Sequence, residues 1–383
     1  MTVSSYSNMA ARNTGLDVLR FAAIVLVIGR HSGSAPRVAF IEPVAEAWRR
    51  GGWVGVDLFF VLSGFLISGL LFSEFRKTGR IDVRKFLVRR GWKIYPAFLV
   101  LIALTVEYQK FHHTGNSAEL VAEVTFMQSY FAGIWPHTWS LSVEEHFYLA
   151  LPFVLIACFR PRAENAERRL LLALLTVAVA CLLVRLMHAR AEPYAFITHA
   201  FPSYLRIDSL GFGVALSYAY HFRSEFFRRV VAPNRLILAI IGCVLLIPVF
   251  VWDIQRTPYL YTFGFTVIYI GCGMLVAASV LTNFSNVKPA KWAAEVGVFS
   301  YSIYLWHIPY LTIFLPWLEK MGLRYPAWAW PIIFVGGSIV LGIAMAKLVE
   351  IPALRLRDEF YPRNAKPLAT AGSYSLEHSV ALL

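Results

Sequence analysis

The chain has 383 residues, of which 58% are hydrophobic and only 15% are charged, and its formal net charge is +13. Soluble globular proteins have about 25% charged residues, so this composition excludes a disordered chain and argues strongly against an ordinary soluble enzyme. The apolar residues form unbroken runs and do not alternate, which excludes a β-barrel and predicts an all-α, polytopic membrane helical bundle.

Ten segments are predicted to cross the membrane, because a spanning helix needs about 20 mostly apolar residues. Six of them contain no Asp, Glu, Lys or Arg: residues 58–73, 170–184, 236–252, 257–287, 296–318 and 325–346. Four weaker segments carry ionisable residues: 16–34, 94–109, 139–159 and 205–221. The chain therefore divides into an N-terminal segment (1–14), a transmembrane domain (15–351) and a C-terminal tail (352–383).

Lys and Arg are distributed unevenly between the two sides that ten spans define. The connections on the side of the N-terminus hold 23 of them, and those on the opposite side hold eight. Because Lys and Arg are enriched in cytoplasmic connections, both termini are predicted to be cytoplasmic. The positive charge thus reflects topology and attraction to anionic lipid, and no nucleic-acid partner is expected. The four cysteines lack metal-ligand spacing, so no metal site is expected.

The first predicted span contains a cation and an imidazole on one helix face. Charge inside a span is costly, so such residues are functional candidates that face the bundle interior. Arg20 and His31 are 11 residues apart, which separates them by about 16 Å along one face. Asp17, one turn before Arg20, is positioned to pair with it. The structural alternatives are an Arg20 that reaches the lipid headgroups and a His31 that only packs.

The span that begins at Trp139 carries two adjacent carboxylates, Glu144 and Glu145, near its predicted extracytoplasmic end. Adjacent helical residues point about 100° apart, so one carboxylate is expected to face the cavity and the other to complement the helix N-terminus. A carboxylate beside an imidazole orients the ring and stabilises its protonated form. That is the usual requirement of a histidine general base.

A basic segment on the predicted cytoplasmic side runs into the third span. Arg90 and Lys93 are one turn apart, and Arg89 shares a face with Lys93. Such cations suit the phosphates of a nucleotide-like donor, although topogenic charge and anionic-lipid binding explain them almost as well. Weaker single candidates are Asp57, Arg206, Asp208 and His307, and a Lys347–Glu350 ion pair is expected at the end of the last span.

Six motifs follow one another along the chain. They are Gly15-Leu-Asp-x-Leu-Arg20 with His31 eleven residues later, Gly55-Val-Asp-Leu-Phe-Phe-Val-Leu-Ser-Gly64, Arg89-Arg-x-x-Lys-Ile-Tyr-Pro96, Trp139-Ser-Leu-Ser-Val-Glu-Glu-x-Phe-Tyr148, Arg206-x-Asp208 and Ser300-Tyr-Ser-Ile-Tyr-Leu-x-His307. The ordered set resembles the acyltransferase-3 family of membrane O-acyltransferases, which modify bacterial cell-surface glycans and some secondary metabolites. The resemblance covers about residues 14–352. Two departures are Lys93, where the family usually has Arg, and Arg30 directly before His31.

The resemblance implies an enzyme that moves an acyl group, with acetyl as the expected one, from a cytoplasmic acyl-CoA to a hydroxyl of an extracytoplasmic glycan or glycolipid. His31 would be the general base, Glu145 or Glu144 would orient or charge-balance it, and Arg20 would help to hold the donor or the cavity. The expected donor-binding residues are Arg90, Lys93 and Arg89. The expected substrate and cavity residues are Arg30, Asp57, Trp139, Ser142, Arg206, Asp208 and His307, and Asp17 joins the catalytic group through Arg20.

No cofactor besides the acyl-CoA co-substrate is expected, and the predicted location is the bacterial inner membrane, crossed several times. The acceptor stays open among lipopolysaccharide, exopolysaccharide, a lipo-oligosaccharide signal and a macrolide. Acetyl against a longer acyl group is open too, as is the oligomeric state. Direct transfer and a covalent acyl-histidine are both compatible with the residues. The alternative from another class is a transporter or flippase whose buried charges line a substrate path, but the sequence contains no inverted repeat that would support it.

Overall fold

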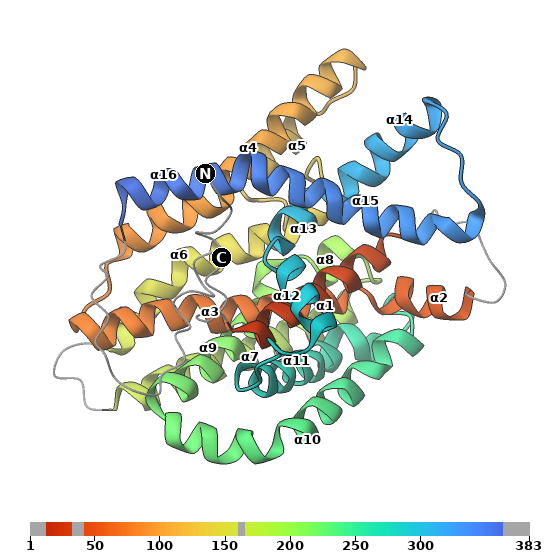
Figure 1. Cartoon of the computed structure of the whole chain (residues 1–383). Coiled ribbons are helices and arrows are strands. Elements are labelled where there is room, and N and C mark those ends of the chain that lie inside the picture. The colour runs from red at the N-terminus through yellow and green to blue at the C-terminus, as the bar shows by residue number, and fades with distance from the viewer. Residues whose placement is uncertain (1–12, 33–41, 160–164, 363–383) are drawn as a thin grey trace.

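The structure is a computed structural model of the chain and describes residues 13–32, 42–159 and 165–362. Over these residues the chain forms helices and connections and no strand, as the all-α class predicts. The helices are packed into one bundle, with α3 and α1 near its centre (Figure 1). Most of the predicted segments 1–14 and 352–383 lies outside the described residues.

Nine longer helices and seven shorter ones carry the fold over the described ranges. The longer ones are α1 (Thr14–Arg30), α3 (Val54–Thr78), α4 (Val83–Phe111), α6 (Trp139–Cys158), α7 (Ala166–Ala191), α9 (Ile207–Phe222), α10 (Ser224–Val251), α11 (Phe265–Val280) and α15 (Trp330–Met345). The shorter ones are α2 (Glu42–Gly51), α5 (Ser117–Val124), α8 (Phe196–His199), α12 (Lys288–Gly297), α13 (Ser300–Pro309), α14 (Leu315–Lys320) and α16 (Ile351–Phe360).

Seven helices in the described part of the chain are long and apolar enough to cross a membrane. The number is eight if residues 288–297 and 300–320, which meet at a bend of 69°, form one broken span. Each of the ten predicted segments overlaps a helix, but α1 and α9 have only 17 and 16 residues. The total of ten spans and the cytoplasmic location of the termini therefore stay predictions.

Helix α3 is the central element, since 17 of its 25 residues are buried. It packs closely on α9, and glycines make this approach possible. A Cβ on Gly64 would lie 2.0 Å from the carbonyl oxygen of Leu210, and one on Gly213 would lie 2.3 Å from that of Val61. Small residues at helix crossings are typical of membrane bundles, where packing has to replace the hydrophobic effect between helices.

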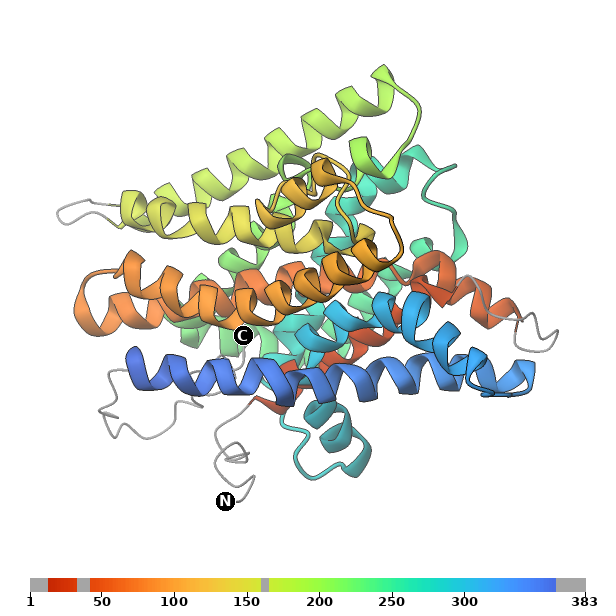
Figure 2. The ribbon, with the colours of Figure 1, turned by 90° about the horizontal axis from the view of Figure 1, so that it is seen from above.

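The outer helices expose apolar side chains, as a lipid-facing surface requires. Leu175 of α7 is 60% exposed, and Leu236 of α10 is 70% exposed. Figure 2 shows α7 along one edge of the bundle and the continuous α15–α16 helix near the other side. Contiguous apolar exposure on this scale is incompatible with water and suits a bilayer.

Three buried ion pairs connect helices that are distant in sequence. Asp57 of α3 pairs with Arg206 at 2.6 Å, and Asp208 of α9 pairs with Arg185 of α7. Lys93 of α4 pairs at 2.5 Å with Glu350 in the π-helical segment η9 (Ala346–Glu350).

The expected Lys347–Glu350 pair is therefore wrong. Glu350 lies inside the bundle, where it also accepts a hydrogen bond from Ser302. The last helix continues through η9 and α16 to Phe360, so the predicted tail begins within a helix.

Candidate active site

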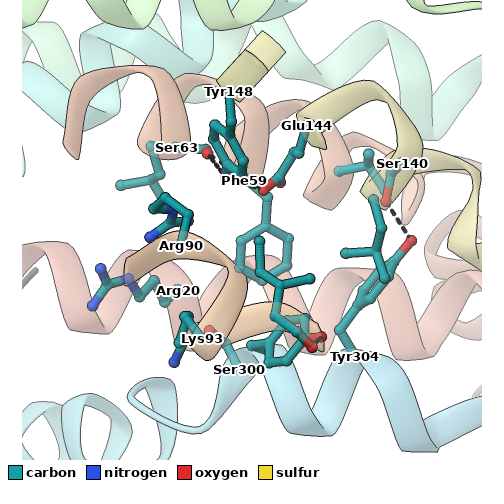
Figure 3. Close-up of a pocket in the computed structure, with 15 residues that line it drawn as sticks. Arg20, Phe59, Ser63, Arg90, Lys93, Ser140, Glu144, Tyr148, Ser300 and Tyr304 are labelled. Carbon is teal, nitrogen blue, oxygen red and sulfur yellow. Dashed lines mark hydrogen bonds between the residues drawn. The ribbon is translucent and has the colours of Figure 1, made fainter. Parts of the chain in front are cut away.

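A first cavity of about 80 Å³ lies between α1, α3, α4, α6 and α13. Several polar side chains of these helices turn into this cavity, because exposure to lipid would be costly. Figure 3 shows its polar lining: Arg20, Ser63, Arg90, Lys93, Ser140, Glu144, Tyr148, Ser300 and Tyr304. The structure thus gathers four of the predicted site residues, from three helices, around one small space.

Arg90 brings a buried guanidinium to this cavity. Its side chain is buried, and its guanidinium lies 4.6 Å from the centre of the Tyr148 ring. Its Nε and Nη1 atoms have no hydrogen-bond partner among the described residues. A buried donor without a partner is costly, so these atoms are suited to an anionic or carbonyl ligand that enters the cavity.

The other predicted donor-binding cations are held by carboxylates. Lys93 is bound to Glu350, and Arg89 lies 3.0 Å from Asp358 and donates to the carbonyl of Tyr361. Among the three, Arg90 is therefore the residue whose geometry best suits a ligand. Arg20 forms the expected ion pair with Asp17 at 2.5 Å, and both side chains are buried.

The two adjacent glutamates face different neighbours. Glu144 lines the first cavity and accepts hydrogen bonds from Tyr148 and, at 3.4 Å, from Ser63. Glu145 accepts one from Tyr95 at 3.0 Å, and its other oxygen has no partner among the described residues. The expectation that one of them contacts His31 is wrong, since every described partner of both carboxylates lies elsewhere. The rotation of α6 turns Glu144 toward Ser63 of α3 and Glu145 toward Tyr95 of α4.

A second, larger cavity of about 590 Å³ lies at the other end of α1. Predicted site residues that line it are Arg30, His31, Trp139 and Arg206. Two residues, Val56 and Tyr304, line both cavities and so form a shared wall. Tyr304 is fixed there, because its hydroxyl binds Ser140 at 2.7 Å and donates to the carbonyl of His137.

Three histidines from distant parts of the chain meet beside this wall. His31 follows the last residue of α1, His137 lies in the short turn Pro136–Thr138, and His307 lies in α13. His307 Nε2 is 3.1 Å from His31 Nδ1, and the ring centres of His137 and His307 are 5.0 Å apart. No group of three or more His, Cys, Asp or Glu in the described ranges is arranged to hold a metal ion.

The hydrogen-bond network assigns the tautomers of the paired imidazoles. His307 Nδ1 lies 2.5 Å from the carbonyl oxygen of Tyr304, which only accepts, so this nitrogen carries the proton. His307 Nε2 is then an acceptor, and His31 Nδ1 must carry the proton that faces it. His31 Nδ1 is also 3.1 Å from the carbonyl of Val27, which reinforces this assignment. His31 Nε2 is left with a lone pair, which is what a general base needs.

A buried carboxylate fixes the segment that carries His137. Glu123 of α5 is fully buried and accepts hydrogen bonds from the hydroxyl of Thr138 at 2.5 Å and from the backbone of Trp135 at 3.4 Å. Burial raises the pKa of Glu123 to about 7. The histidine cluster is thus held from one side by α1 and α13 and from the other by this carboxylate.

Other predicted residues serve the packing of the bundle. Asp57 and Asp208 form the buried ion pairs with Arg206 and Arg185. Ser142 donates to the carbonyl of Phe126, and its hydroxyl lies 2.9 Å from that of Ser129. These three side chains line neither of the two cavities.

Sequence reasoning missed His137, Tyr304, Tyr148 and Glu123 as members of the site. His137 and Glu123 lie in a polar connection between predicted spans. Ionisable residues are common in such connections, so their presence there does not indicate a functional site. Tyr304 and Tyr148 belong to two of the six motifs, and this membership could have identified them as candidates.

A family model described as an acyltransferase domain matches residues 13–347. The chain is similar to the peptidoglycan O-acetyltransferase OatA of Listeria monocytogenes, with 28% identity over 371 residues, which cover 88% of this chain and 55% of the relative. It is also similar to the putative peptidoglycan O-acetyltransferase YrhL of Bacillus subtilis, with 28% identity over 344 residues, 80% of this chain and 50% of the relative. The O-acetyltransferase OatA of Staphylococcus aureus is 26% identical over 326 residues, 78% of this chain and 50% of the relative. The chain spans about half the length of these relatives, and no solved structure matches it.

Proposed function

Because this chain belongs to the acyltransferase-3 family of membrane O-acyltransferases, we propose that it transfers an acetyl group from acetyl-CoA to a hydroxyl of a cell-surface glycan. The observation that carries the proposal is a pair of cavities that share the wall formed by Val56 and Tyr304. Acyl transfer requires the donor and the acceptor to come together at one point, although each enters its own cavity. The wall that the two cavities share is where the reacting groups would meet. A transporter or flippase is not favoured, because the family match is to acyltransferases.

The first cavity is the proposed donor side. Arg20 and Arg90 reach it from the parts of α1 and α4 nearest the predicted cytoplasmic ends. Arg90 would bind an oxygen of the donor with its unpartnered nitrogens. A cavity of about 150 Å³ accommodates benzene, so about 80 Å³ suits a group of a few heavy atoms such as acetyl. A long acyl chain would not fit without rearrangement.

The second cavity is the proposed acceptor side. It lies at the end of α1 that is predicted to face away from the cytoplasm, and its larger volume suits a sugar. The names of the relatives describe O-acetyltransferases, two of them acting on peptidoglycan, so peptidoglycan or a similar glycan is the proposed acceptor class. The proposed location is the bacterial inner membrane, with both termini in the cytoplasm.

His31 is the proposed general base. Its Nε2 lone pair would take the proton of the acceptor hydroxyl while that oxygen attacks the thioester carbonyl. The carbon–sulfur bond then breaks, and the CoA thiolate leaves with a proton returned from the imidazolium. His307 would stabilise this imidazolium by accepting from His31 Nδ1. A covalent acyl-His31 is the alternative route, and radiolabel retained on protein incubated without acceptor distinguishes it from direct transfer.

The test of the proposal separates the two substrates by the membrane. Purified protein is reconstituted into vesicles that contain a peptidoglycan tetrasaccharide, and labelled acetyl-CoA is added outside. We expect label on the enclosed sugar of intact vesicles and none with His31→Ala. Transfer that requires permeabilised vesicles would contradict the two-sided arrangement, and uptake of sugar without CoA release would indicate a transporter.

A further inference from the structure

The rim of the second cavity carries three arginines, and they differ in their partners. Arg49 of α2 pairs with Glu42 and, at 2.9 Å, with Glu46. Arg50 pairs with Glu46 at 3.3 Å and donates to the carbonyl of Val251 at 2.6 Å. The hydrogen bond from Arg49 lowers the pKa of Glu46, which therefore stays charged and engaged with both arginines.

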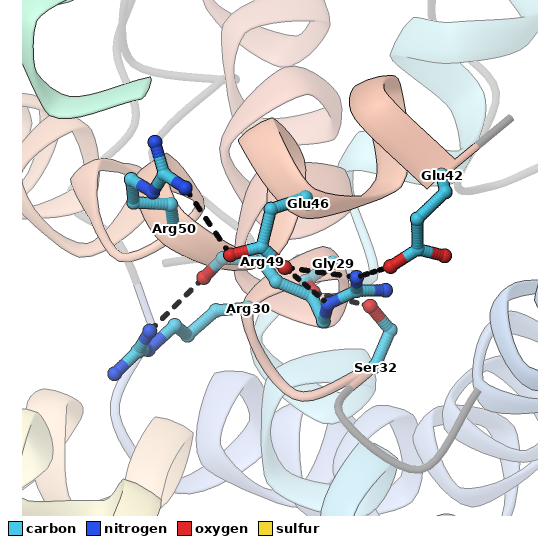
Figure 4. Close-up of polar contacts among 7 residues, drawn as sticks. All are labelled: Gly29, Arg30, Ser32, Glu42, Glu46, Arg49 and Arg50. Carbon is cyan, nitrogen blue, oxygen red and sulfur yellow. Dashed lines mark hydrogen bonds and ion pairs between the residues drawn. The ribbon is translucent and has the colours of Figure 1, made fainter. Parts of the chain in front are cut away.

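Arg30 has no carboxylate partner among the described residues. Its Nη1 donates to the carbonyl of Arg49 at 3.0 Å, and Figure 4 shows its guanidinium lying apart from the Glu42 and Glu46 carboxylates. Its half-buried position beside the cavity reduces its access to water. A cation in such a place gains most from an anion that enters the cavity, because charge-assisted hydrogen bonds are about twice as strong as neutral ones.

An aromatic column holds Arg30 in place. Its guanidinium carbon lies 5.5 Å from the centre of the Phe196 ring. Phe196 stacks on Phe201 at 5.7 Å, and Phe201 stacks on Trp139 at 4.6 Å. At the far end of the column Arg206 lies 5.6 Å from the Trp139 ring, but it is neutralised by Asp57.

The remaining carboxylate of the cavity, Asp253, attracts Arg30 through space but forms no ion pair with it. Asp253 lines the same cavity, and its Oδ1 accepts a hydrogen bond from the backbone of Gln255 at 2.7 Å. It forms no ion pair within 4.0 Å among the described residues. Among the described residues, the cavity thus offers one fixed guanidinium that no carboxylate contacts, next in sequence to His31.

We propose that the acceptor is an acidic saccharide, whose carboxylate or phosphate is bound by Arg30 while one of its hydroxyls lies at His31. The proposal rests on the proposed function and adds the chemical class of the substrate. Binding of the anion by Arg30 increases the affinity and fixes the position of the sugar. Because Arg30 and His31 are adjacent, this position determines which hydroxyl can reach the base. A neutral sugar of the same shape would bind less tightly.

The test uses three forms of a peptide-free peptidoglycan tetrasaccharide. The carboxylates are free in the first form and methyl-esterified in the second, and the third is the ester with a phosphate at its reducing end. Acetyl transfer is measured for the wild type, Arg30→Gln, Arg30→Lys and the control Arg190→Gln. Arg190 is exposed at the end of α7 and lies outside the cavity, so its substitution removes the same charge without touching the site.

We expect the wild type to have a KM for the acid at least tenfold below its KM for the ester. Arg30→Gln should bring the two values together, and Arg30→Lys and Arg190→Gln should preserve most of the difference. A lower KM for the third form than for the ester would identify phosphate as an equivalent anion, and an unchanged one would restrict the site to the carboxylate. Because any effect of Arg30 on the base acts on all three sugars, the ratio of the KM values isolates anion binding.

Equal KM values for acid and ester in the wild type would overturn the inference and leave the proposed function standing. So would a ratio that Arg30→Gln leaves unchanged. A wild type that releases CoA from acetyl-CoA but acylates none of the sugars would overturn the proposed function, and this inference with it. If Arg30→Gln fails to fold, the wild-type comparison of acid and ester still decides the question.

Discussion

His307 Nε2 lies 3.1 Å from His31 Nδ1, and the carbonyl of Tyr304 fixes the proton of His307 on its other nitrogen. The pair resembles the carboxylate–histidine arrangement of other general bases, with a neutral imidazole in the place of the carboxylate. A neutral partner suits a site inside a membrane, because it orients the base without the cost of burying another charge. This relationship was not predicted from sequence, where a glutamate was expected to orient His31.

The first prediction concerns His307 as a positioning residue. Its replacement by Ala removes the acceptor for His31 Nδ1, so kcat should fall by about 10- to 100-fold while KM for acetyl-CoA stays within twofold. His307→Gln offers an amide oxygen that accepts from His31 and should restore part of the rate. Steady-state kinetics of both variants test this, and a His307→Ala enzyme with wild-type kcat would show that His31 needs no orientation.

The second prediction concerns donor binding. Arg90→Gln removes the unpartnered guanidinium from the first cavity, so KM for acetyl-CoA should rise at least tenfold. Arg84→Gln is the matched control, because Arg84 is an exposed residue of the same helix. A KM that responds equally to both substitutions would mean that Arg90 contributes only its positive charge and no contact with the donor.

The third prediction separates a structural ion pair from the chemistry. Asp208→Asn leaves Arg185 buried without its carboxylate, which should cost about 3–5 kcal/mol of stability. The thermal midpoint in detergent should fall, while kcat per folded protein stays near the wild-type value. The double variant Arg185→Met with Asp208→Asn should recover part of the lost stability. An unchanged thermal midpoint together with a strongly reduced kcat would instead indicate that Asp208 takes part in the reaction.

The fourth prediction is a pH dependence that arises outside the spans. The pKa of Glu123 is about 7 in the folded protein and about 4.3 in an unfolded chain. Between these values the unfolded state has lost the proton and the folded state keeps it, so stability falls as pH rises through this window. Glu123→Gln should match the wild type at pH 4 and exceed its thermal midpoint at pH 8. The exposed Glu107 provides the control Glu107→Gln, and an equal gain at both pH values would contradict the assignment.

The helical elements of the fold could be predicted from sequence because the membrane makes apolar runs informative. The ten predicted segments all overlap helices, and the Arg20–Asp17 pair was predicted from helical spacing alone. The close crossing of α3 and α9 at their glycines could not be predicted, because no local sequence pattern indicates which helices are neighbours. The same limit applies to the Lys93–Glu350 pair, which joins residues 257 positions apart.

The sequence indicated several residues that line the candidate site, but not which side chains contact one another there. His31, Arg90 and Arg20 stand out in the sequence as charges inside or beside spans, and all three line a cavity. Which groups contact them depends on the rotation of each helix. Helix α6 begins at the predicted residue, but its rotation directs Glu144 and Glu145 to α3 and α4 and not to His31.

His31 is the proposed base for acetyl transfer between the two cavities. The most direct measurement is the initial rate at which label passes from acetyl-CoA to the tetrasaccharide, compared for wild type and His31→Ala at equal amounts of folded protein. We expect His31→Ala to lose at least a hundredfold in rate while it binds acetyl-CoA with unchanged affinity. A folded His31→Ala protein that transfers acetyl at the wild-type rate would contradict the account.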